Sequence, residues 1–88
     1  MDMQLTDKLA LVTGSTAGIG YAIAKSLAAE GARVIVNGRT QSSVDEAVSA
    51  LVATTGSRVL GFAGDLSTAT AAEALLQQSP NIDILVNN

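Results

Sequence analysis

The segment Thr13–Gly20, which reads Thr-Gly-Ser-Thr-Ala-Gly-Ile-Gly, constrains the fold more than any other part of the chain. It follows an apolar run, Leu9–Val12, and leads into a helical pattern that begins around Gly18. A strand, a glycine-rich turn and a helix N-terminus in this order form a site for a phosphorylated ligand. The reason is that the first N–H groups of the helix lack partners and the helix dipole is positive there. The glycine spacing is GxxxGxG rather than GxGxxG.

Short apolar runs alternate with longer helical patterns along the rest of the chain, which is typical of βαβ units. The strands are predicted at about Leu9–Thr13, Arg33–Asn37, Arg58–Ala63 and Ile82–Val86, with a helix in each interval. A capping box at Ser43–Glu46 is predicted to begin the second helix. Right-handed crossovers then give the strand order 3-2-1-4. We therefore predict an α/β fold, a Rossmann-type doubly wound parallel sheet that is truncated after its fourth strand.

Composition excludes several classes of function. The 88 residues contain no cysteine and no histidine, so no disulfide, no thiolate metal site and no other metal site is predicted. The net charge is −3 and the five basic residues are scattered, which argues against nucleic acid and anionic membranes as partners. The N-terminus lacks the features of a secretory signal, and no apolar run approaches the roughly 20 residues of a spanning helix. We expect a cytoplasmic protein.

Four motifs together carry a family resemblance. They are TGxxxGIG at Thr13–Gly20, the turn Asn37–Thr40 after the second strand, the pair Asp65-Leu66, and Asn87-Asn88 as the start of NNAG. In this order and approximate spacing, the chain resembles the N-terminal half of a short-chain dehydrogenase/reductase. The resemblance covers essentially the whole chain and implies that residues 1–88 form the N-terminal part of a single Rossmann-fold NAD(P)-binding domain.

The resemblance also implies which residues contact the cofactor. Those expected at the diphosphate and the adenosine ribose are Gly14, Ser15, Thr16, Gly18, Ile19 and Gly20. Asp65 is expected to bind the adenine amino group, Leu66 to add a backbone contact, and Asn87 to lie beside the cofactor. Purely structural interpretations exist for each: turn formation for the glycines, a helix N-cap for Asp65 and a strand terminus for Asn87.

The end of the second strand distinguishes the two nicotinamide cofactors. An acidic residue there would accept hydrogen bonds from the ribose 2′-OH and repel a 2′-phosphate. This chain has Gly38 followed by Arg39, whose guanidinium can pair with a phosphate. The sequence therefore favours NADP(H) over NAD(H), although Ala17 stands where NADP-dependent relatives often carry a second basic residue. Arg39 could also be a solvated turn residue.

Tyr21 and Lys25 match the YxxxK catalytic signature of the family, but we reject them as catalytic residues. Both lie on the first helix, at the diphosphate end of the site, whereas the catalytic Tyr and Lys of the family lie on a later helix. The resemblance places the catalytic Ser, Tyr and Lys beyond Asn88, so no catalytic residue is predicted and the segment alone is expected to be inactive. The resemblance also places beyond Asn88 the long helices through which family members dimerise or tetramerise. The full-length protein is therefore expected to be a homo-oligomer.

Two main hypotheses follow. The first is the NADP(H)-binding half of an oxidoreductase that transfers hydride between the nicotinamide and a ketone or secondary alcohol. The second is a non-catalytic nucleotide-binding module, which is either a natural truncation or a relative whose catalytic half has decayed. A methyltransferase is disfavoured because no acid follows the second strand, and nucleotide-sugar epimerases are disfavoured by the glycine spacing.

Overall fold

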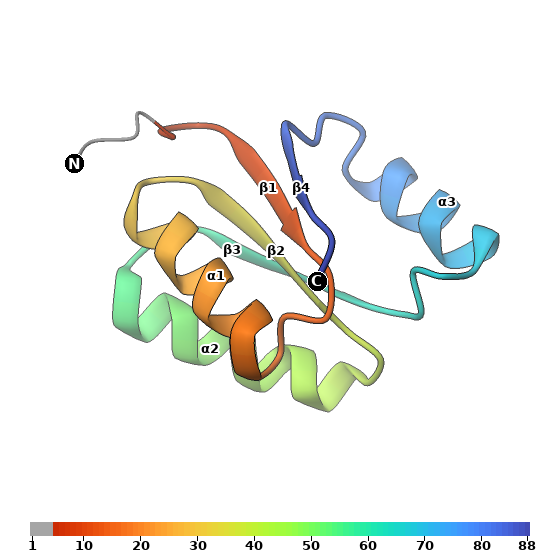
Figure 1. Ribbon diagram of the computed structural model, residues 1–88, viewed down its shortest axis with the longest axis horizontal. Coiled ribbons are helices and arrows are strands. Elements are labelled where there is room, and N and C mark those ends of the chain that lie inside the picture. Colours follow the sequence, from red (N-terminus) through yellow and green to blue (C-terminus); the bar gives the residue numbers. More distant parts are fainter. Residues whose placement is uncertain (1–4) are drawn as a thin grey trace.

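The computed structural model describes residues 5–88; residues 1–4, on which the predicted absence of a secretory signal partly rests, lie outside it. Within the described range, strands and helices alternate regularly (Figure 1). Their bounds in chain order are β1 Leu9–Val12, α1 Gly18–Ala29, β2 Arg33–Gly38, α2 Gln41–Thr55, β3 Val59–Ala63, α3 Ala69–Gln78 and β4 Ile84–Val86.

The strands form one parallel sheet in the order β3-β2-β1-β4, which confirms the predicted fold class and strand order. Ala10 of β1 lies opposite Val34 of β2 on one side and opposite Ile84 of β4 on the other. Apart from Arg33, every residue of β2 is buried, as expected for a β-branched strand covered on both faces. Because all strands are parallel, their carboxyl ends and the turns that follow them meet at one edge of the sheet.

The larger hydrophobic core lies between the sheet and the helices α1 and α2. Val12, Val34 and Val36 point to this face and pack with Ala24 of α1 and Leu51 of α2. Small alanine side chains on α1 allow the helix to approach the sheet closely. This core fixes the direction in which the N-terminus of α1 points.

A smaller core lies on the opposite face, beneath α3. Leu9, Leu11 and Ile35 pack there with Leu75, which is the buried residue of α3. In Figure 1 the strands lie between the α1–α2 pair and α3, so the chain forms three layers. Alternate residues of one strand therefore serve two different cores.

The start of α2 differs from the prediction. The N-cap is Thr40 rather than Ser43, so the predicted capping box is wrong. Thr40 has an extended backbone, and its Oγ1 accepts a hydrogen bond from the Ser43 N–H at 3.3 Å. The chain turns into the helix directly after β2, and the first hydroxyl in that turn therefore caps it.

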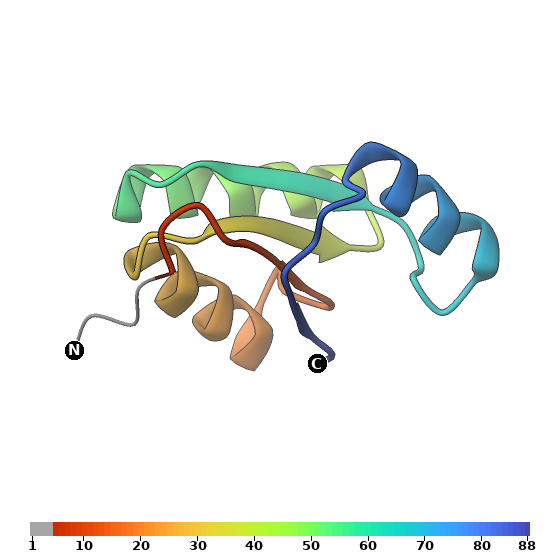
Figure 2. The same ribbon diagram turned by 90° about the horizontal axis from the view of Figure 1, so that it is seen from above.

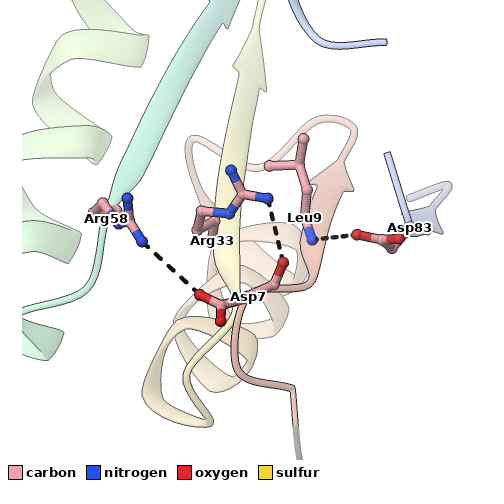
Figure 3. A network of polar contacts seen from close by, with 5 residues as sticks. All are labelled: Asp7, Leu9, Arg33, Arg58 and Asp83. Carbon is pink, nitrogen blue, oxygen red and sulfur yellow. Dashed lines mark hydrogen bonds and ion pairs between the residues drawn. The ribbon is translucent and has the colours of Figure 1, made fainter. Parts of the chain in front are cut away.

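The start of β4 also differs, and the reason is visible at the amino ends of the strands (Figure 3). The Asp83 side chain accepts a hydrogen bond from the Leu9 N–H at 2.9 Å, while the Asp83 N–H donates to the Leu9 carbonyl at 2.8 Å. This side-chain bond replaces a ladder bond, so β4 begins at Ile84 and not at Ile82.

The same edge holds the one ion pair of residues 5–88, between Arg58 and Asp7 at 4.0 Å. Both side chains are highly exposed, so the pair contributes little stability. Arg33 donates to the Asp7 carbonyl at 3.2 Å. These contacts lie far from the carboxyl ends of the strands and belong to the fold, not to the site described next.

Candidate functional site

The glycine-rich turn joins β1 to α1 and has a defined backbone geometry. Gly14 and Gly18 have φ values of 58° and 64°, in the left-handed region that glycine adopts without strain. The Gly14 N–H donates to Asn37 Oδ1 at 3.2 Å, and the Ser15 N–H donates to the Asn37 carbonyl at 2.8 Å. The turn is therefore anchored to the end of β2.

Helix α1 approaches this turn so closely that position 20 has no room for a side chain. A Cβ on Gly20 would clash with the Gly14 carbonyl oxygen and would lie 2.7 Å from Asn88 Nδ2. This close approach is a steric reason for glycine, in addition to any ligand contact. It brings the first turn of α1 directly against the glycine turn.

The N-terminus of α1 is uncapped, unlike those of the other two helices. Its N-cap residue Ala17 makes no side-chain hydrogen bond, and no acidic residue lies in its first turn. By contrast, Thr40 and Thr68 cap α2 and α3. The free N–H groups and the dipole of α1 therefore suit an anionic group.

Asn37 is a buried polar residue of β2 that is hydrogen-bonded to the turn after β1 and to the end of β3. The residue is 5% exposed, and its Nδ2 donates to the carbonyls of Phe62 and Gly64, both at 3.1 Å. Its backbone N–H donates to Ser15 Oγ at 2.9 Å. We did not predict this role, although a polar side chain at the end of a fully buried strand signals a need for partners.

The last two residues of the chain bind the same turn. The Asn88 N–H donates to Thr13 Oγ1 at 2.9 Å, and Asn88 Nδ2 donates to the Gly14 carbonyl at 3.1 Å. Thr13 Oγ1 donates to Asn87 Oδ1 at 3.3 Å. Figure 2 shows this end of the chain, in dark blue, beside the turn between β1 and α1. Asn88 was not among the predicted site residues.

A cavity of about 1090 Å³ opens at the carboxyl ends of the strands. Six of the ten predicted site residues line it, namely Gly14, Thr16, Arg39, Asp65, Leu66 and Asn87. Its lining also includes residues that the prediction missed, among them Thr13, Asn37, Gly38, Ser43 and Asn88. An apolar wall is formed by Leu75, Leu76, Ile82 and Leu85. Sequence alone could not identify this wall, because it depends on where α3 lies relative to β4.

The other four predicted residues do not line the cavity. Ser15 is fully buried, and its hydroxyl donates to the Val12 carbonyl at 2.7 Å, so its side chain supports the turn. Gly18 and Ile19 are exposed at the start of α1, and Gly20 is buried against Gly14.

Arg39 and Asp65 are the two charged residues of the cavity lining, and both are exposed. Hydrogen bonds from the Ser67 hydroxyl and backbone N–H lower the pKa of the Asp65 carboxyl, and the positive charge of Arg39 acts in the same direction. The N-cap of α3 is Thr68, so the alternative interpretation of Asp65 as that N-cap is wrong. Asp65 therefore presents a carboxylate acceptor at neutral pH.

Tyr21 and Lys25 do not reach the cavity. The Tyr21 side chain is half-buried and packs against the core between the sheet and α1, while Lys25 is exposed.

Over residues 5–88, no group of three or more acidic side chains is arranged to hold a metal ion. In that same part of the chain, no helix has the length and apolar character needed to cross a membrane.

Comparison with known proteins assigns this arrangement to a family. The model of the short chain dehydrogenase family matches residues 8–88. The chain belongs to the short-chain dehydrogenase family. It is 50% identical to the uncharacterized oxidoreductase YvrD of Bacillus subtilis, and the match covers 100% of this chain and 34% of YvrD. It is 46% identical to dehydrogenase/reductase SDR family member 4 of Mus musculus, over 96% of the chain and 31% of that protein.

Solved structures are also similar to this chain. The L-sorbose reductase of Gluconobacter frateurii, complexed with NADPH and L-sorbose, matches with a TM-score of 0.91 and 40% identity, over 100% of this chain and 35% of the reductase. A Pseudomonas aeruginosa RhlG/NADP complex matches with a TM-score of 0.83 and 36% identity, over 96% of this chain and 35% of that one. The chain spans about a third of the length of the curated relatives it matches.

Proposed function

We propose that the cavity binds NADP(H), with the cofactor diphosphate at the N-terminus of α1. The observation that carries this proposal is the uncapped first turn of α1, set against a glycine turn that lines the cavity. A diphosphate can approach such a backbone closely because Gly14 and Gly18 carry no side chain. The NADP(H) complexes of related structures support the proposal.

The residues around the cavity suit the remainder of the adenosine moiety. Asp65 offers a carboxylate to an amino group, and Arg39 offers a guanidinium to a phosphate. No acidic side chain that would repel a 2′-phosphate stands at the end of β2, since Gly38 occupies that position. We therefore propose a preference for NADP(H) over NAD(H), with the remaining predicted contacts at Ser15, Thr16, Ile19, Gly20, Leu66 and Asn87.

We further propose that the whole protein reduces a ketone or oxidises a secondary alcohol. When bound, the nicotinamide supplies or accepts the hydride. In this proposal the residues of this chain bind and orient the cofactor. Tyr21 packs in the core, and neither it nor Lys25 lines the cavity. A cytoplasmic homo-oligomer is part of the same proposal.

The cofactor preference can be tested by replacing Arg39 with Asp and titrating the protein with NADPH and with NADH. NADPH affinity should fall roughly 10- to 100-fold, because a hydrogen bond to a charged group contributes about 1.5–3 kcal/mol. NADH affinity should change much less.

The matched control is Arg58→Asp, which makes the same charge change at the amino ends of the strands. It should leave both affinities nearly unchanged. Equal losses of NADPH and NADH binding in Arg39→Asp would contradict the preference, and a lack of binding of either nucleotide to the unmutated protein would contradict the function.

A further inference from the structure

The position that distinguishes the two cofactors is in direct steric contact with the glycine turn. Gly38 ends β2 and is buried. A Cβ built on it would lie 2.5 Å from Thr16 Cγ2, which is closer than real Cβ atoms approach other heavy atoms. Val44 Cγ2 at 3.3 Å and Ser43 Oγ at 3.4 Å would also be close, but they would need to move by only a few tenths of an ångström. The methyl group of Thr16 therefore occupies the space that a side chain at position 38 needs.

The backbone at Gly38 cannot easily move away from this contact. Gly38 is paired with Ala63 in the sheet, and its carbonyl accepts a hydrogen bond from the Gly64 N–H at 2.9 Å. The preceding residue, Asn37, is held by the side-chain and backbone bonds described above. The largest accommodation must therefore come from Thr16.

Thr16 has limited means of accommodation. Its side chain is β-branched, so few χ1 rotamers are open to it. Its backbone follows Gly14 and Ser15, both of which are hydrogen-bonded to Asn37. A shift of Thr16 would therefore displace the turn that adjoins the N-terminus of α1.

From this contact, and on the basis of the function proposed above, we infer that Thr16 is a specificity-determining residue. Its γ-methyl group excludes an acidic side chain from position 38. The ribose 2′ position therefore meets the guanidinium of Arg39 and no carboxylate. The site thus favours a 2′-phosphorylated adenine nucleotide through Thr16 and Arg39, which lie on different loops. Changing position 38 alone does not switch the cofactor preference from NADPH to NADH.

Two substitutions of Thr16 separate its methyl group from its hydroxyl group. Thr16→Ser removes Cγ2 and keeps the hydroxyl, whereas Thr16→Val keeps a methyl group and removes the hydroxyl. Each substitution is combined with Gly38→Asp. All variants are made in the protein at its natural length and are titrated with NADPH and with NADH.

Gly38→Asp alone should weaken both nucleotides at least 10-fold, because the acidic residue displaces the turn. Adding Thr16→Ser should recover NADH binding at least 10-fold while NADPH binding stays weak. Adding Thr16→Val should recover neither. The inference is overturned if Gly38→Asp alone exchanges NADPH for NADH, or if the Ser and Val double variants bind alike.

A second measurement does not depend on any nucleotide. Gly38→Ala adds only the Cβ and should lower Tm; Thr16→Ser should restore Tm in the double variant and Thr16→Val should not. Equal Tm values for the two double variants overturn the inference. If the unmutated protein binds neither nucleotide, the proposed function fails, and the Tm series still decides whether Thr16 and Gly38 compete for the same space.

Discussion

Asn37, in β2, joins the turn that follows β1 to the end of β3. Its side chain accepts from the Gly14 N–H after β1 and donates to the Phe62 and Gly64 carbonyls at the end of β3. All of these partners are 23 to 27 residues away in the sequence. The shape of the cavity between the glycine turn and Asp65 therefore depends on one buried amide.

Replacing Asn37 with Ala should lower the free energy of unfolding by roughly 2–4 kcal/mol, because one buried N–H and two carbonyls lose their partner. Urea denaturation measures this change. NADPH affinity should fall as well, since the turn loses its anchor. The control is Asn81→Ala, at an exposed asparagine, which should alter stability by less than about 0.5 kcal/mol. Equal effects at the two positions would show that the Asn37 bonds do not order the cavity.

At the scale of the elements, the approach of α1 to the glycine turn is the critical packing contact. Gly20→Ala would place a methyl group against the Gly14 carbonyl oxygen and push the helix N-terminus away from the turn. We expect a loss of about 1–3 kcal/mol in the free energy of unfolding, which is typical of overpacking, together with at least 10-fold weaker NADPH binding.

Thermal unfolding and a nucleotide titration check this expectation. Ser26→Ala serves as the control, because it changes an exposed position of the same helix. A Gly20→Ala variant with the stability and affinity of the Ser26→Ala variant would refute the packing argument.

The order of elements was predictable because apolar runs and glycine turns are local signals. The runs at Leu9–Val12 and Arg33–Asn37 identify strands, and the handedness of the crossovers then gives the sheet order. The ends of elements were less predictable, because side chains from elsewhere decide them. Asp83 replaces a ladder bond before β4, and Thr40 caps α2 in place of Ser43.

At the scale of the whole molecule, the described chain has a radius of gyration of 11.8 Å. This is close to the roughly 12 Å of a folded domain of this length. The glycine turn, Arg39 and Asp65 could be assigned to one cavity from sequence, because parallel strands bring their carboxyl ends together. Asn37 and the wall formed by Leu75, Leu76, Ile82 and Leu85 could not, because both depend on contacts distant in sequence.

The most direct test of the cofactor site is a titration of the ¹⁵N-labelled protein with NADPH, followed through its backbone amide resonances. The largest shifts should occur in the glycine turn and the first turn of α1, and at Arg39 and Asp65. Shifts confined to the opposite edge of the sheet, around Arg33 and Asn81, or no shifts at saturating NADPH, would contradict the proposal that this cavity holds the cofactor.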